Sequence, residues 1–236
     1  MSSGPPYYYS WTPAAPPVPR VSTSRTEILH LSIAFVVLTV DLTIIFGGGG
    51  LLTGGGAGFR SLASLSVVLI AAAAALTGFL CHELAHKIYA QRHGFWAEFR
   101  MSPFGLVFSL ITAYLGFLWA APGATVISGM SAVDRENWGR TSLAGPLSNV
   151  TFAVIFFAGA IATYRVNAWA YSALILLAWV NGWFGTFNLL PVGPLDGAKV
   201  LRWSAGTWVA AIVLIGGFTA LLTLILYGVT TPFLGF

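Results

Sequence analysis

The sequence HELAH at residues 82–86 contains the residue types of a zinc-dependent hydrolytic centre. In an α-helix, residues four apart lie on one face about 6 Å apart along the axis. The imidazoles of His82 and His86 can therefore reach one Zn²⁺ at about 2.1 Å. Glu83 lies beside them and can deprotonate a zinc-bound water. A solvated helix end is the alternative interpretation, but the chain has only 4 histidines, which makes a chance match rare.

The composition predicts that a membrane protein carries this motif. Hydrophobic residues make up 57% of the 236 residues and charged residues 8%, against about 25% charged in soluble domains. A net charge of +4 from 11 Lys and Arg provides too few cations for a nucleic-acid surface. The single cysteine, Cys81, excludes an intramolecular disulfide framework.

Long apolar runs predict the membrane-spanning helices. A helix needs about 20 residues to cross roughly 30 Å of hydrocarbon. We expect an all-α polytopic membrane protein with five to six transmembrane helices and a small membrane-associated strand or re-entrant region. The domain covers 28–236, after a Pro/Ser/Tyr-rich tail at 1–27 that we expect to be disordered. The apolar runs are 28–46, 61–80, 101–133, 141–164, 166–195 and 203–236.

The motif directly follows the run 61–80, with no glycine or proline at the junction. The helix should therefore continue to about Ala90, which would place the motif at or inside one membrane boundary. Ionisable groups at such a depth are costly and usually functional. At 141–164, Gly145-Pro146 predicts a helix start.

Zinc in a catalytic site needs a third protein ligand and an open position for water. Asp196 is favoured, because Pro191, Gly193 and Pro194 must interrupt the helix before it. Irregular backbone at membrane depth is tolerated where it lines a cavity, although an ordinary loop remains the alternative. The other candidates are His30, Asp41, His93, Glu98, Asp134 and Glu136.

Three segments together resemble the site-2 protease family of intramembrane zinc metalloproteases: HELAH, AGPLSN at 144–149 and FNLLPVGPLDG at 187–197. The resemblance covers about 62–203, in a minimal form without a PDZ-like or other regulatory domain. It implies that His82, His86 and Asp196 bind one Zn²⁺ and that Glu83 is the catalytic base. It also implies that Asn188 helps to hold the substrate or the tetrahedral intermediate. Ala85 stands where the family commonly has glycine.

The resemblance also implies transmembrane protein substrates within the lipid bilayer, hydrolysed in or near their spans. Two alternative functions are a catalytically inactive membrane scaffold and a zinc transporter. An intact Glu83 disfavours the scaffold, and a transporter would need more deep polar groups than Asp41. Nucleic acid is not an expected partner, and the sequence does not specify an oligomeric state.

The path of 101–133 decides whether Asp196 can meet the histidines. If this run crosses the membrane, Asp196 lies about 30 Å away on the opposite face. If it dips in and returns, nine of the 11 cationic side chains fall on the face of the motif; otherwise the split is six against five. The positive-inside rule favours the return path, with the site towards the cytosol of a multi-pass cell-membrane protein. Residues 98–107 would then form a strand or re-entrant piece whose edge could pair with an unwound substrate.

Overall fold

The structure is a computed structural model that describes residues 21–48, 51, 64–131 and 133–234. Five helices of the described chain are long and apolar enough to cross a membrane. Four of these spans are α1 (Arg25–Phe46), α6 (Arg135–Thr163), α7 (Ala168–Asn188) and α9 (Ala205–Leu234). The remaining span joins α3 (Leu65–Ala75), the π-helical turn η2 (Leu76–Leu80) and α4 (Cys81–Arg92). The predicted multi-pass, helical fold is confirmed.

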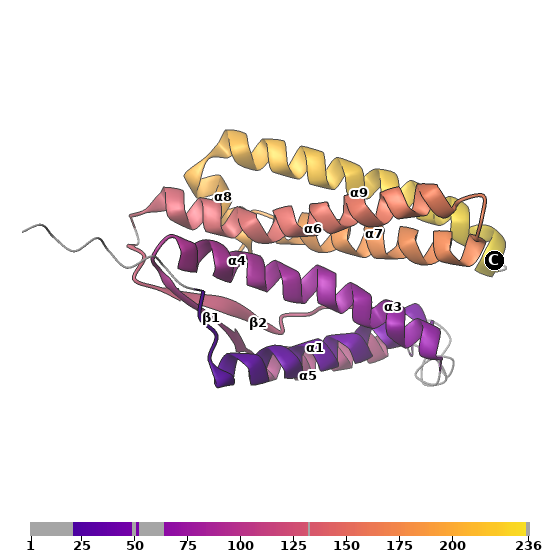
Figure 1. Ribbon diagram of the computed structural model, residues 1–236, viewed down its shortest axis with the longest axis horizontal. Helices are drawn as coiled ribbons and strands as arrows, with labels where there is room; N and C mark the ends of the chain where they lie inside the picture. Colours follow the sequence, from indigo (N-terminus) through magenta and orange to yellow (C-terminus); the bar gives the residue numbers. More distant parts are fainter. Residues whose placement is uncertain (1–20, 49–50, 52–63, 132, 235–236) are drawn as a thin grey trace, which may run out of the picture.

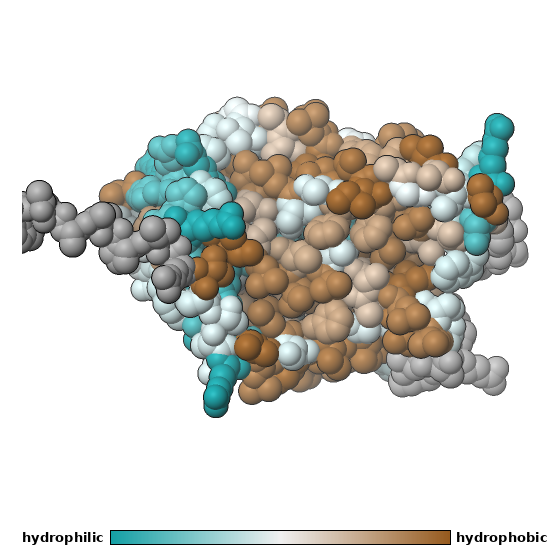
Figure 2. Space-filling model, viewed as in Figure 1, coloured by the Kyte–Doolittle hydropathy of each residue, from teal (hydrophilic) through white to brown (hydrophobic). Residues whose placement is uncertain are grey.

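The spans run along the long axis in two layers (Figure 1). One layer contains α1, α3 with α4, and α5 (Pro103–Leu115); the other contains α6, α7 and α9. The end that holds α4, the strands and the short helix α8 (Asp196–Trp203) is called the site end below. On the face that Figure 2 shows, apolar residues cover the middle and hydrophilic residues gather mainly at the site end.

Residues 101–133 leave the site end and return to it. Strand β1 (Trp96–Met101) pairs antiparallel with β2 (Gly123–Ser128), with Phe99 opposite Thr125. Helix α5 connects the two strands along the chain and has 13 residues. A helix needs roughly 20 residues to span the membrane. The expected return path is therefore what the structure has. Only the first part of 98–107 is a strand, because Ser102 caps α5 by accepting from Gly105 N at 3.1 Å.

Small side chains allow the spans of the first layer to approach closely. Ala34 of α1 and Ala71, Ala74 and Ala75 of α3 are fully buried, and Leu38 and Phe79 complete the contact. Close approach through small residues is a common way for helices to pack in lipid. This packing fixes the direction of the helix that carries the HELAH sequence.

Two helix starts differ from the predicted positions. Helix α6 begins at Arg135, since Asp134 accepts from Asn137 N at 3.1 Å and caps it, and Pro146 lies inside the helix. The predicted start at Gly145-Pro146 is wrong. Helix α1 begins at Arg25 after the cap Ser24, so the last residues of the predicted tail are helical. Residues 1–20 of that tail lie outside the described residues.

Candidate metal centre

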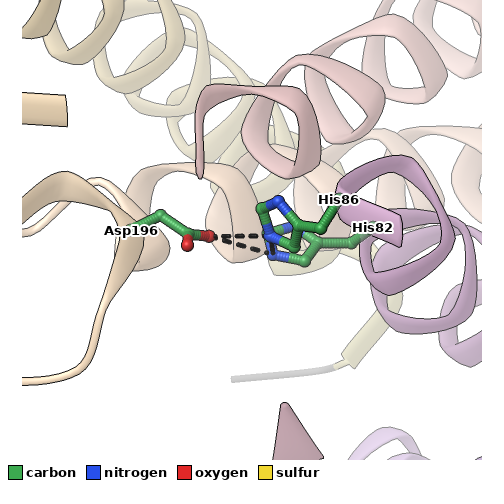
Figure 3. A group of neighbouring side chains, drawn as sticks. All are labelled: His82, His86 and Asp196. Atoms are coloured by element: carbon green, nitrogen blue, oxygen red, sulfur yellow. Dashed lines mark hydrogen bonds and ion pairs between the residues drawn. The ribbon is translucent and has the colours of Figure 1, made fainter. Parts of the chain in front are cut away.

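Helices α4 and α8 bring His82, His86 and Asp196 together at the site end (Figure 3). Their ligand atoms lie within 4.8 Å of one another, and all three residues are buried. Asp196 Oδ2 is 3.3 Å from His82 Nε2 and 3.0 Å from His86 Nε2, while the two Nε2 atoms are 3.0 Å apart. Two imidazole nitrogens and a carboxylate oxygen converging on one point form a donor set that suits zinc.

Hydrogen bonds on the far side of each imidazole fix its tautomer. His82 Nδ1 donates to Asn149 Oδ1 at 2.6 Å, and His86 Nδ1 donates to the carbonyl of Thr141 at 2.7 Å. Asn149 Nδ2 donates to the carbonyl of Gly78 at 2.8 Å, which turns the amide oxygen towards His82. Each Nε2 therefore keeps its lone pair for a metal, as partners beyond the ligands usually ensure.

The π-helical turn directly before the motif takes part in this support. Asn149 binds Gly78 of this turn, and Asn181 Nδ2 donates to Thr77 Oγ1 at 2.9 Å. Both asparagines are fully buried, one on α6 and the other on α7. Isolated π-helical turns often occur at functional sites. The turn thus links α6 and α7 to the start of α4, directly before the HELAH segment.

At Gly145 the backbone of α6 passes very close to both imidazoles. A Cβ added there would overlap His86 Nε2 and would lie 2.6 Å from His82 Cε1. Glycine at this position is therefore required by space and not by backbone conformation, because the residue is helical. The absent side chain leaves room beside His86 Nε2 and His82 Cε1.

The carboxylate of Glu83 is held by strand β2. Glu83 Oε2 accepts from Thr125 N at 2.9 Å and from Thr125 Oγ1 at 2.8 Å. Glu83 also lines a cavity of about 220 Å³ that includes both histidines, Asp196 and Asn188. The base predicted from the sequence is thus positioned at the same space as the predicted ligands.

Asp196 begins α8 and lies directly after the irregular segment that the prolines create. Burial raises the pKa of its carboxyl, but where the imidazoles of His86 and His82 are protonated, their charge and hydrogen bonds hold that pKa well below its usual value. Gly197 packs so closely on the carbonyl of Leu189 that a Cβ would overlap it. The end of α7 thereby fixes the position of Asp196.

Asn188 is the last residue of α7, and its Nδ2 donates to the carbonyl of Phe184 at 3.0 Å. An amide nitrogen carries two hydrogens, so one remains available to a ligand in the cavity that Asn188 lines. Its predicted contact with substrate stays a prediction.

The other candidate ligands are not part of the three-residue group found among the described residues. Glu98 pairs with Arg100, Glu136 pairs with Arg140, and Asp134 caps α6. His93 Nδ1 bonds to the carbonyl of Tyr89, and His30 Nδ1 accepts from Met101 N. Asp41 is fully buried in the middle of α1.

Sequence reasoning missed four residues around the centre: Thr125, Thr141, Gly145 and Asn149. Two of them, Gly145 and Asn149, belong to the AGPLSN segment, which was used for the resemblance and for a predicted helix start but not for the metal centre. A polar Asn149 within an apolar run was a usable signal, because buried polar groups in spans usually find a partner. No comparable signal marked Thr125 or the carbonyl of Thr141.

Comparisons with known proteins place these features in context. The chain is 36% identical over 155 residues to the protein named "Putative zinc metalloprotease MJ0611" of Methanocaldococcus jannaschii, a match that covers 65% of this chain and 80% of that protein. It is 34% identical over 129 residues to "Putative zinc metalloprotease Rip3" of Mycobacterium tuberculosis, covering 54% of this chain and 28% of that protein. No family model and no solved structure matches the chain.

Proposed function

This chain belongs to the site-2 protease family of zinc metalloproteases, and we propose from this premise that it hydrolyses peptide bonds in or near the transmembrane segments of other membrane proteins. The observation that carries the proposal is the buried convergence of His82, His86 and Asp196 beside Glu83. These groups lie within a bundle of apolar helices that are long enough to cross a membrane. The proposal assigns one Zn²⁺ to each chain.

The residues present fit zinc in type and in the space that they leave. His82, His86 and Asp196 would hold the ion, with the tautomers fixed by Asn149 and the carbonyl of Thr141. When bound there, zinc supplies a Lewis acid that polarises the peptide carbonyl and lowers the pKa of water.

The chain's own groups account for the proton transfers. The Glu83 carboxylate takes a proton from the attacking water and later passes it to the leaving amide nitrogen. The two bonds from Thr125 both go to Oε2 and hold the carboxylate in place, which leaves Oε1 to accept the proton. The free hydrogen of the Asn188 amide donates to the oxyanion, a contact typically worth about 3 kcal/mol.

The hairpin offers an edge to an unwound substrate. Since Thr125 N points away from β1 to Glu83, the amides of Gly123 and Ile127 point to the same side. No partner is recorded for these two backbone groups among the described residues, and both residues line the cavity. The substrate-pairing strand in this proposal is therefore β2, and the earlier assignment to 98–107 is corrected. Main-chain hydrogen bonds would hold the extended segment beside Glu83.

The depth of the motif supports cleavage within the membrane. His82 lies about 25 Å along its span from Leu65, at 1.5 Å per residue, and the hydrocarbon layer is about 30 Å thick. Among the lysines and arginines of the described chain, Arg165 is the only one at the end of the bundle opposite the site end, where it follows α6. This distribution supports a cell-membrane protein whose site end faces the cytosol.

A reconstituted cleavage assay tests the proposal. Purified protein in lipid vesicles is mixed with a single-span reporter peptide that has a glycine-proline break, and the products are mapped by mass spectrometry. We expect cleavage in the half of the span nearer the site end. Glu83→Gln should retain about one zinc per chain and lose activity by about 10²–10⁴-fold. Asp196→Ala should lose both zinc and activity.

Glu136→Gln is the matched control, because this exposed acid pairs only with Arg140 on the surface of α6. It should resemble the wild type in zinc content and rate. Retained turnover in Glu83→Gln would refute the role of the base. Unchanged zinc content in Asp196→Ala would refute the third ligand.

A further inference from the structure

A second cavity adjoins the metal centre on the side of α6 and α8. It has a volume of about 700 Å³ and is lined by Arg135, Trp138, Lys199 and Arg202. Trp138 and Lys199 also line the cavity that contains Glu83 and Asp196. The space between these four residues is called the basic cavity, and it adjoins the candidate active site through these two shared residues.

The cations of the basic cavity lack the partners that neighbouring cations have. Lys87 pairs with Glu27, Arg100 with Glu98, and Arg140 with Glu136. In contrast, no ion pair or hydrogen bond is recorded for the guanidinium of Arg135 or of Arg202 among the described residues. The recorded acid beside Lys199 is Asp196, at 3.4 Å.

Asp196 itself faces both histidines, so it only partly neutralises Lys199. Three cations around one space repel one another, and a bound anion would remove that repulsion. Arg25 and Arg92 also lack a recorded acid, but neither lines this cavity. The basic cavity thus combines concentrated positive charge with room for a ligand.

The surface next to the basic cavity identifies the kind of anion. Helix α9 begins at Ala205, three residues after Arg202, and exposes Val209, Val213 and Leu214. Trp203 comes between Arg202 and the start of α9 in the sequence. The Arg140 guanidinium lies over its ring, 5.9 Å from the ring centre. Tryptophan and arginine are typical of the level of the lipid headgroups. A phospholipid could place its phosphate among the cations and its acyl chains along α9.

We propose that the basic cavity binds the phosphate of an anionic phospholipid headgroup beside the active site. A carboxylate of the substrate is less well suited, because the edge of β2 would hold the substrate on the Glu83 side of the centre. Strand β2 packs on α4, whereas Arg135 and Arg202 lie on α6 and α8, which pack on each other. The lipid therefore occupies a position beside the substrate path and not within it.

Lipid retention by the intact protein tests this proposal without any proteolysis. Protein is exchanged into vesicles of phosphatidylcholine with one-fifth phosphatidylglycerol, extracted gently and examined by native mass spectrometry. The wild type should retain phosphatidylglycerol in preference to phosphatidylcholine. Each basic side chain at an anionic surface contributes roughly a fivefold gain in binding. The double variant Arg135→Gln/Arg202→Gln should therefore lose about 25-fold in preference.

Two further variants make the result specific to the basic cavity. Arg25→Gln/Arg92→Gln removes the same charge from the site end outside the cavity and should keep the preference. Arg135→Lys/Arg202→Lys keeps the charge and should retain most of the binding, even if the glutamine variant fails to fold. An equal loss in the Arg25/Arg92 variant would overturn the proposal.

Soluble competitors distinguish the possible sources of the anion. Millimolar inorganic phosphate, or a soluble peptide rich in aspartate, should not displace phosphatidylglycerol from the wild type. Displacement by phosphate would identify a free-phosphate site, and displacement by the peptide alone would identify a substrate-binding subsite. Either result would overturn the assignment to a lipid.

Discussion

Replacing Gly145 with alanine should damage the metal centre while leaving the helix that carries it intact. The new Cβ would lie 2.6 Å from His82 Cε1 and would overlap His86 Nε2. Ordinary carbon contacts are about 3.5–4 Å, so at least one imidazole must retreat by about 1 Å. Zinc ligands hold their distances within about 0.2 Å. We therefore expect a loss of zinc affinity at the upper end of the 10–100-fold range that follows loss of supporting groups.

Gly159→Ala is the control on the same helix. A Cβ at Gly159 would lie 3.4 Å from Leu174 Cδ1, an ordinary contact. Both substitutions should strengthen α6 locally by about 0.5–1 kcal/mol, because alanine favours helix over glycine. A difference between the two variants therefore reports the clash with the imidazoles and not the propensity of the helix.

The assay is zinc content per purified chain, followed by titration against a chelator of known affinity. Thermal unfolding in the same detergent, with and without added zinc, shows whether each variant is folded. We expect Gly159→Ala to match the wild type and Gly145→Ala to gain little stability from zinc. Zinc affinity of Gly145→Ala within threefold of Gly159→Ala would refute the argument from close approach.

Three further predictions follow from the contacts around the centre. Asn149→Ala removes the acceptor for the imidazole of His82, so zinc affinity measured against a chelator should fall by about 10–100-fold; an unchanged affinity would contradict this. Thr125→Val removes the 2.8 Å hydroxyl bond to Glu83 but keeps the 2.9 Å amide bond, so kcat should fall about tenfold at unchanged zinc content. Loss of zinc would instead indicate a distorted site. Glu27→Gln or Lys87→Met leaves a buried partner unpaired and should cost about 3–5 kcal/mol. Unfolding in mixed detergent should show the double variant to be more stable than either single one, and additive losses would refute the pairing.

The sequence allowed prediction of what depends on local spacing and on composition. HELAH places two imidazoles on one helical face whatever surrounds it, and the apolar runs require spans of predictable length. The return path of 101–133 followed from the distribution of charge, which the membrane imposes. These features placed Asp196 near the histidines before the structure did so.

Contacts between segments that are far apart in the sequence could not be predicted in this way. Asn149 reaches His82 across 67 positions of sequence, and Thr125 reaches Glu83 across 42. The start of α6 was also misplaced, because Pro146 looked like a helix start. In the structure the cap is Asp134, and the proline lies inside the helix, next to Gly145, where the backbone of α6 passes very close to both imidazoles. The packing of α6 on α4 therefore accounts for the glycine at position 145, which local helix signals could not explain.

The hairpin shows how irregular backbone is accommodated beside a membrane span. Side chains of neighbouring helices satisfy the outer edge of β1: Glu27 accepts from Phe99 N at 3.0 Å, and Gln91 donates to the carbonyl of Ala97 at 2.7 Å. At the outer edge of β2, the described chain supplies only the carboxylate of Glu83, to Thr125.

Unsatisfied backbone groups cost several kcal/mol each in hydrocarbon. The edge of β2 must therefore face water or another backbone, and it faces the cavity that holds the metal centre. The polar groups that the fold leaves open are thus located where a hydrolase needs water and an extended substrate. Under the proposed function, a helical substrate satisfies its own backbone and gains nothing from this edge, whereas an unwound one gains hydrogen bonds. We therefore expect the hairpin to favour segments that have already lost their helix.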